Sequence, residues 1–175
     1  LECVACSPRL SPLPDAEAQC AELAALIRPS LQADTTLVGI HSGGAWIARR
    51  VQALLGLPGE AGVIDVSLHR DDYRQRGLHP QVQPTQLPFA VDARPMILID
   101  DVLFTGRTTR AAINELFDYG RPRRIQLAVL ADRGGRELPC QPDFCVWRPQ
   151  LAEREELILE ATPDGRLQWR CDPHA

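Results

Sequence analysis

The segment PMILIDDVLFTGRTTR, residues 95–110, constrains the fold more than any other part of the sequence. Its apolar first half is typical of a buried strand, and it leads into two aspartates, Asp100 and Asp101. A small turn with Gly106 among hydroxyl side chains comes next, and helical spacing follows from Thr108 to Gly120. A buried strand, a tight turn and a helix form the repeating unit of parallel α/β sheets. This segment therefore predicts one unit of such a sheet.

The same alternation runs along the rest of the chain. We expect helices at residues 15–31 and 45–56, strands at 35–40, 61–68, 95–100 and 123–132, and then a short strand at 144–147 and a hairpin at 156–170. This order predicts an α/β fold with a mostly parallel central sheet flanked by helices. It forms a single domain over residues 15–175, and the Pro-, Ser- and Cys-rich residues 1–14 form a loose lead-in.

Ligand sites in parallel sheets lie beyond the carboxyl ends of the strands. Three segments follow predicted strands and should meet at that edge: residues 41–44, 100–109 and 132–139. The polar, Pro- and Gln-rich segment 69–94 is too long for a plain connection, and such segments are typically active-site lids or disordered. We expect a flexible lid there, with a solvated charged loop as the alternative, and a small hood at 133–175.

The composition of the chain limits the classes of molecule that it is expected to bind. The formal net charge is −4, and arginine supplies all 19 positive charges because the chain has no lysine. A slightly acidic protein is a poor candidate for general nucleic-acid binding, although forked arginine donors suit phosphates. No stretch is apolar for long enough to span a membrane, and the first residues lack the pattern of a secretory signal. We therefore expect a cytoplasmic protein without a membrane partner.

The turn at Thr105–Thr109 has the features of a phosphate pocket. Backbone N–H groups, the start of the following helix and several hydroxyls can all face an anion there, and Gly106 permits close approach. Carboxylates repel phosphate, so Asp100 and Asp101 suit sugar hydroxyls or a divalent metal instead. A ribose 5-phosphate meets both needs. The alternative is an ordinary strand, turn and capped helix whose strand ends on polar residues.

The segment MILIDDVLFTGRT resembles the phosphoribosyl-diphosphate motif of type I phosphoribosyltransferases. Together with IDVSLHRDDY, RPRRIQLAVLADRGGRELP and PDF, it resembles the PyrR family from about residue 37 to residue 160. Members of this family are bifunctional pyrimidine-operon attenuation regulators and uracil phosphoribosyltransferases. The resemblance implies a type I phosphoribosyltransferase fold and a homo-oligomer. It also implies the salvage reaction, with Mg²⁺, of uracil and phosphoribosyl diphosphate to UMP and pyrophosphate.

The resemblance also implies roles for individual residues. Catalysis falls to Asp100 and Asp101, which would also hold the metal, and to Arg70 and Asp71 of the lid. Phosphoribosyl diphosphate would be bound by Asp100, Asp101, Val102, Leu103, Phe104, Thr105, Gly106, Arg107, Thr108 and Thr109, with His41, Ser42, Gly43 and Gly44 near the pyrophosphate. The base would be bound by Phe104, Arg133, Gly134, Gly135, Val146 and Trp147.

Two of these assignments depend on further reasoning. Relatives that use guanine or hypoxanthine usually carry an acidic residue at the position of Phe104, so Phe104 disfavours those bases and is compatible with a pyrimidine. Trp147 has two open roles, because it can stack on the base or cap the core.

The sequence departs from the family pattern in two places. The pyrophosphate loop, commonly T-R-G, reads Ser42-Gly43-Gly44, which removes one charge-assisted contact. The first helix is acidic, and Gly135 and Gln141 replace common basic residues, while Arg136 and Arg148 remain. Weak RNA binding is therefore expected. The alternative function is a UMP- or UTP-sensing regulator that binds leader RNA, with weak or no catalysis, and a phosphoribosyltransferase for another base is a third.

Overall fold

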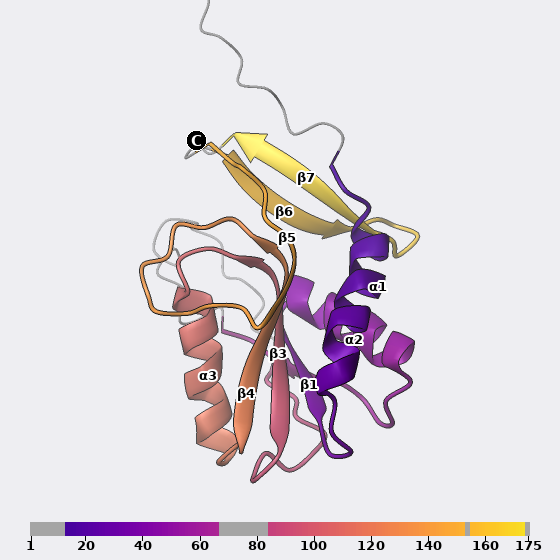
Figure 1. The fold of residues 1–175 in the computed structure, drawn as a ribbon, viewed down its shortest axis with the longest axis vertical. Coiled ribbons are helices and arrows are strands. Elements are labelled where there is room, and N and C mark those ends of the chain that lie inside the picture. The colour runs from indigo at the N-terminus through magenta and orange to yellow at the C-terminus, as the bar shows by residue number, and fades with distance from the viewer. Residues whose placement is uncertain (1–12, 67–83, 153–154, 174–175) are drawn as a thin grey trace, which may run out of the picture.

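The computed structural model describes residues 13–66, 84–152 and 155–173. Its helices are α1 (Ala16–Ile27), α2 (Gly43–Leu55) and α3 (Arg107–Tyr119), with a short 3₁₀ helix, η1 (Arg28–Ser30). Its strands are β1 (Thr36–Ile40), β2 (Gly62–Ile64), β3 (Pro95–Leu103), β4 (Arg124–Asp132), β5 (Phe144–Trp147), β6 (Glu155–Ala161) and β7 (Leu167–Pro173). Figure 1 shows helices on both sides of one sheet.

The central sheet has five parallel strands in the order β2-β1-β3-β4-β5. Two apolar clusters cover its faces, one against α1 and α2 and the other against α3 (Figure 1). Neighbouring residues of β3 alternate between them, since Ile97 and Ile99 belong to the first cluster and Leu98 to the second. This is the period of two expected of a strand buried on both faces. The predicted α/β class and parallel sheet are confirmed.

The helices begin and end for local reasons. The Asp15 side chain accepts a hydrogen bond from Glu17 N at 3.0 Å and so caps α1. That helix was expected to reach residue 31 but ends at Ile27, because a proline at position 29 cannot continue an α-helix. Helix α2 ends at Gly56, whose φ of 66° is the left-handed conformation that glycine adopts readily.

Strand β3 is longer than the sequence indicated. The prediction ended it at Asp100, where the apolar run stops, but the strand continues to Leu103. Strand β4 runs beside it over the same length, with Val102 opposite Ala131 and Leu103 opposite Asp132. The ladder therefore carries the acid pair inside the strand, where the hydrophobic pattern gives no signal.

Only part of the expected lid can be placed. The predicted catalytic residues Arg70 and Asp71 lie outside the described residues. Further along, Gln86 exchanges two backbone hydrogen bonds of 2.8 Å with Val63, and Thr85 donates to Glu115 at 2.9 Å. Residues from 84 onward thus pack against β2 and α3 as part of the folded body, although the expected lid reached residue 94.

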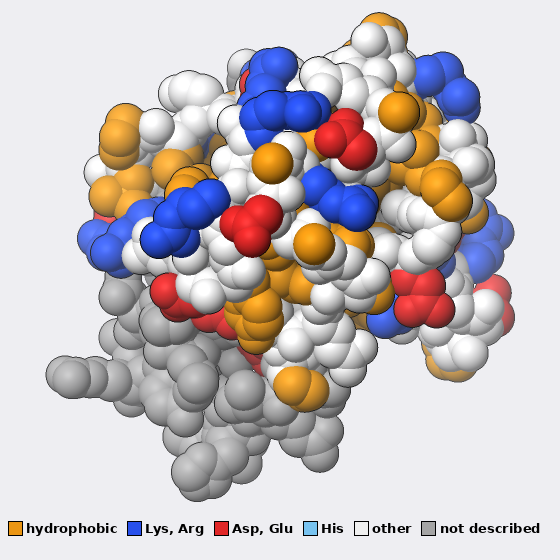
Figure 2. Space-filling view, turned by 90° about the horizontal axis from the view of Figure 1, so that it is seen from below, with side chains coloured by type: hydrophobic (Ala, Val, Ile, Leu, Met, Phe, Trp, Pro, Cys, Tyr) orange, Lys and Arg blue, Asp and Glu red, His pale blue; other side chains and the backbone are white. Residues whose placement is uncertain are grey.

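The carboxyl ends of the strands point towards the hairpin β6–β7 in Figure 1, and the amino ends lie at the opposite pole. Figure 2 views the molecule from that opposite pole, where arginine and acidic side chains lie interspersed. Arg123, near the start of β4, pairs with Asp34 at 3.4 Å. Within the described ranges, no helix is long and apolar enough to cross a membrane.

Candidate active site

Three loops meet at the carboxyl edge of the sheet. Strand β1 leads through His41 and Ser42 into α2, β3 leads through residues 104–106 into α3, and β4 leads into the loop 133–143. Because β1, β3 and β4 are neighbours in the sheet, the three loops are also neighbours. The structure therefore brings together the three segments that the sequence placed at one edge.

The acid pair lies at the centre of this edge. Asp100 is buried, with 4% of its surface exposed, and Asp101 is half-buried. The Oδ1 of Asp100 accepts from Asp101 N at 3.0 Å, and the Oδ1 of Asp101 accepts from Val102 N at 2.8 Å. Backbone amides thus orient both carboxylates, as a site that must bind a ligand in one geometry requires.

The start of α2 packs directly on this strand, and two glycines make that possible. A Cβ atom at Gly43 would overlap the Asp101 carboxylate, and a Cβ atom at Gly44 would overlap the carbonyl oxygen of Ile99. The arginine that the family commonly carries at position 43 would meet the same obstacle. The departure Ser42-Gly43-Gly44 therefore coincides with close contact between the expected pyrophosphate loop and Asp101.

The residues before α2 complete this side of the site. His41 N donates to Ile64 O at 2.8 Å, which fixes the loop to β2, and Trp46 N donates to Ser42 O at 3.2 Å. The peptide bond between His41 and Ser42 is cis. The Ser42 side chain is exposed and makes no capping hydrogen bond. The first N–H groups of α2 are therefore not capped by that side chain.

The turn between β3 and α3 is the place where the sequence predicts an anion pocket. Gly106, with φ of 89°, precedes the helix, and Thr105 Oγ1 accepts from Arg107 N at 3.2 Å. Thr109 is 2% exposed, and its hydroxyl oxygen has no hydrogen-bond partner among the described residues. A buried hydroxyl without a partner is costly, and this one lies in the first turn of α3, directly after the predicted pocket.

The residues expected to bind the base divide into two groups. The Arg133 guanidinium carbon lies 3.9 Å from the centre of the Phe104 ring, a cation–π contact. Gly135 also touches this ring, because a Cβ atom there would overlap it. Phe104 is 43% exposed. Arg133 and Gly135 therefore both contact Phe104, and Gly134 lies between them in the chain.

Val146 and Trp147 end β5 at the same edge of the sheet, but their side chains pack on its α1 and α2 face. The Trp147 ring lies 6.0 Å from the Trp169 ring of β7, with 59° between the ring planes. Of the two roles left open for Trp147, this contact favours the one in the core.

Arg136 belongs to the loop expected to cover the base, but from the sequence it has no role of its own beyond that of a cation for RNA. Its side chain is 16% exposed and pairs with Asp132 at 2.7 Å. It also donates to Cys140 O and to Phe104 O, each at 2.8 Å. The four-residue spacing of Asp132 and Arg136 across two glycines was the available signal.

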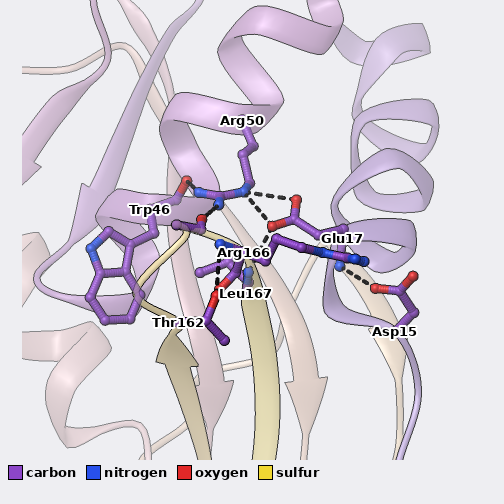
Figure 3. A network of polar contacts seen from close by, with 8 residues as sticks. Asp15, Glu17, Trp46, Arg50, Thr162, Arg166 and Leu167 are labelled. Atoms are coloured by element: carbon purple, nitrogen blue, oxygen red, sulfur yellow. Dashed lines mark hydrogen bonds and ion pairs between the residues drawn. The ribbon is translucent and has the colours of Figure 1, made fainter.

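The expected hood at 133–175 consists of two separate parts. The loop 133–143 lies beside the turn before α3, whereas the hairpin β6–β7 lies against α1 and α2 (Figure 1). Figure 3 shows what holds the hairpin: Arg50 donates to both carboxylate oxygens of Glu17, at 3.0 and 2.9 Å, and Leu167 N donates to Glu17 Oε1 at 2.7 Å. The hydrogen bond from Arg50 lowers the pKa of the Glu17 carboxyl below its ordinary value.

Residues 9–152 match the phosphoribosyl transferase domain family. A protein named bifunctional protein PyrR from Ralstonia nicotianae is 54% identical over 155 residues, which cover 86% of this chain and 88% of that protein. A second protein of that name, from Pseudomonas aeruginosa, is 55% identical over 122 residues, covering 70% of this chain and 72% of that one. A solved hypoxanthine-guanine phosphoribosyltransferase from Bacillus anthracis shares the fold, with a TM-score of 0.62 and 13% identity over 77% of this chain and 79% of that chain.

Proposed function

The chain belongs to the PyrR family of phosphoribosyltransferases, and we propose that it transfers ribose 5-phosphate from phosphoribosyl diphosphate to uracil. The observation that carries this proposal is the acid pair of β3 beside the turn that opens α3. One ligand with a phosphate end and a sugar end fits both. In the reaction, the bond between C1 of the ribose and the pyrophosphate breaks, N1 of uracil bonds to C1, and N1 loses its proton.

Each side of the site has its own task. The 5-phosphate binds at residues 105–109, where backbone N–H groups and hydroxyls converge. Asp100 and Asp101 bind the ribose hydroxyls, and their negative field favours the positive charge that develops at C1. The pyrophosphate lies near residues 41–44. Arg70 and Asp71 stay predicted catalytic residues of a lid that excludes water.

The acid pair also fits a divalent cation. Mg²⁺ usually takes one or two carboxylates together with waters and substrate phosphates, so it needs no cluster of protein ligands. In the part of the chain that the structure describes, no three His, Cys, Asp or Glu side chains gather into a metal site. Asp100 and Asp101 are neighbours with backbone-oriented carboxylates. Mg²⁺ held there with the diphosphate would offset the charge of the departing pyrophosphate.

The base lies beside Phe104 and the loop 133–135 in this proposal. Phe104 offers an apolar ring where purine-using relatives carry an acid, which supports a pyrimidine. The test is pyrophosphate release from phosphoribosyl diphosphate and Mg²⁺ with a panel of bases, namely uracil, cytosine, hypoxanthine and guanine. Release with uracil alone supports the proposal. Release with a purine in preference to uracil contradicts it. Well-folded protein that releases no pyrophosphate with any of these bases also contradicts it.

A second function, nucleotide-dependent control of gene expression through RNA, rests on relatives that are named bifunctional. We expect only weak RNA binding, because the Arg136 side chain is 16% exposed and pairs with Asp132. Arg148 is exposed. Retention of a pyrimidine-operon leader RNA with and without UMP tests this function. Retention of the RNA that does not change when UMP is added would contradict this second function.

We also propose that the protein is cytoplasmic and forms a homo-oligomer. Leu26 of α1 and Leu54 of α2 are 46% and 48% exposed, and a hydrogen bond of 3.1 Å from Arg28 to Leu54 O links the two helices at this point. These side chains support a self-contact through the first two helices. Light scattering of the wild type and of Leu54→Glu measures it, and a monomeric wild type would contradict it.

A further inference from the structure

Arg136 joins three segments of the candidate active site. Its guanidinium contacts the Asp132 carboxylate at the end of β4, the Gly134 and Cys140 carbonyls in the following loop and the Phe104 carbonyl just after β3. Asp132 in turn accepts from Gly134 N at 3.0 Å. The side chains of Arg136 and Asp132 are 16% and 11% exposed, so solvent screens this ion pair only in part.

The loop 132–140 also binds the turn before α3, residues 104–106, through its backbone. Glu137 N and Leu138 N both donate to Thr105 O at 3.0 Å. Cys140 packs on Gly106, where a Cβ atom would lie 3.1 Å from the Cys140 Cβ. Two successive carbonyls of the turn, those of Phe104 and Thr105, are therefore bound by the loop 132–140.

We propose that Arg136 is a positioning residue that couples the base side of the site to its phosphate side. When phosphate binds, the turn at residues 104–106 becomes fixed. Because Arg136 binds both this turn and the loop 132–140, the part of that loop beside the base becomes fixed as well. Ribose 5-phosphate therefore tightens the binding of uracil, and by linkage uracil tightens the binding of ribose 5-phosphate by the same factor. The coupling rests on the proposed function for the identity of the two ligands.

Only a guanidinium fits this place. Its planar fork can direct N–H groups towards a carboxylate and backbone carbonyls at once, whereas a lysine ammonium is a point charge on a flexible stem. Arg136→Lys keeps the charge that pairs with Asp132 but loses the contacts with the carbonyls of Phe104, Gly134 and Cys140. Asp132→Asn keeps the shape and removes the charge, and it serves as a second variant should Arg136→Lys fold poorly.

Arg50 provides a matched control. It also binds one carboxylate, that of Glu17, and two carbonyls, those of Trp46 at 3.3 Å and Gly165 at 2.6 Å. Its side chain is 26% exposed. Its partners lie in α1, α2 and the turn before β7, none of which carries the loop 132–140. Arg50→Lys should therefore change stability as much as Arg136→Lys does without changing the coupling.

The experiment measures the dissociation constant of uracil by calorimetry, with and without saturating ribose 5-phosphate, for the wild type and the three variants. We expect ribose 5-phosphate to tighten uracil binding about fivefold or more in the wild type and in Arg50→Lys. We expect less than a twofold effect in Arg136→Lys and Asp132→Asn. Full coupling in both of those variants would overturn the proposal, and so would loss of coupling in Arg50→Lys.

A measurement without ligand separates this inference from the proposed function. Amide hydrogen exchange of the wild type and Arg136→Lys should show faster exchange in residues 103–108 and 133–140 together, and no change in the hairpin. Faster exchange in 133–140 alone would overturn the inference, since the turn would then be independent of Arg136. Absence of pyrophosphate release in the wild type would instead overturn the proposed function and leave this exchange result standing.

Discussion

Arg136 and Arg50 each bind one carboxylate together with backbone carbonyls, three for Arg136 and two for Arg50, but they join different parts of the molecule. Arg50 ties the hairpin β6–β7 to α1 and α2, across segments far apart in the sequence. Arg136 ties the ends of β3 and β4 at the candidate active site. An arginine bound to a carboxylate and to backbone carbonyls can therefore stabilise the fold in one place and set the geometry of a site in another.

The largest expected effect tests the site side of this comparison. Asp101→Asn keeps the shape of the side chain but removes the charge beside C1 of the ribose, so the rate of pyrophosphate release should fall about 100-fold or more. The melting temperature should change little. Asp34→Asn, at the amino end of the sheet, is the control and should keep full activity. An Asp101→Asn variant with more than half of the wild-type rate would contradict this assignment.

Two adjacent glycines separate stability from activity within one loop. Gly44→Ala places a methyl group against the Ile99 carbonyl, which cannot move alone, and should cost roughly 2–3 kcal/mol of unfolding free energy. Gly43→Ala meets the Asp101 side chain, which can rotate away, so activity should fall about tenfold with a smaller loss of stability. Denaturant unfolding and turnover of both variants check this. If Gly43→Ala and Gly44→Ala lowered turnover equally and unfolding free energy equally, the two glycines would not have separate roles.

The hairpin side of the comparison predicts the reverse pattern. Arg50→Ala removes an ion pair and two hydrogen bonds to carbonyls, and should cost about 2 kcal/mol of unfolding free energy. For a chain of this size the melting temperature should fall by about 4–8 °C. Turnover below the melting transition should not change. Loss of turnover in a fully folded Arg50→Ala protein would show that the hairpin also shapes the site.

The smallest expected effect is a pH dependence at Glu17. Its folded pKa is lowered from 4.5, chiefly by the hydrogen bond from Arg50. A lowered pKa adds stability above pH 4.5, and that stability is lost as pH falls through the folded pKa. The difference in unfolding free energy between the wild type and Glu17→Gln should therefore shrink between pH 7 and pH 3. A difference that stays constant over this range would show that the charge of Glu17 contributes nothing.

The parts of this structure that the sequence predicts are those with local signals. The apolar run before Asp100 and the helical spacing after Thr108 were sufficient to predict a parallel α/β sheet. The carboxyl-edge rule was sufficient to place the acid pair beside the turn. These features depend on residues close in the sequence and on a topology with few alternatives.

The missed features depend on contacts between distant segments. Strand β3 continues to Leu103 because β4 lies beside it, and nothing in residues 100–103 shows this. The sequence leaves two roles open for Trp147 and assigns no contact to Arg136, because only the folded backbone brings Trp147 to Trp169 and Arg136 to the Phe104 carbonyl. A single sequence shows that an arginine is present but not which carbonyls it meets.

The most direct test of the central claim is a crystal structure of the wild type with UMP. We expect the phosphate against residues 105–109, the ribose hydroxyls at Asp100 and Asp101, and the uracil ring beside Phe104 and the loop 133–135. A UMP molecule whose phosphate lies away from that turn, or whose ribose does not reach either aspartate, would contradict the account.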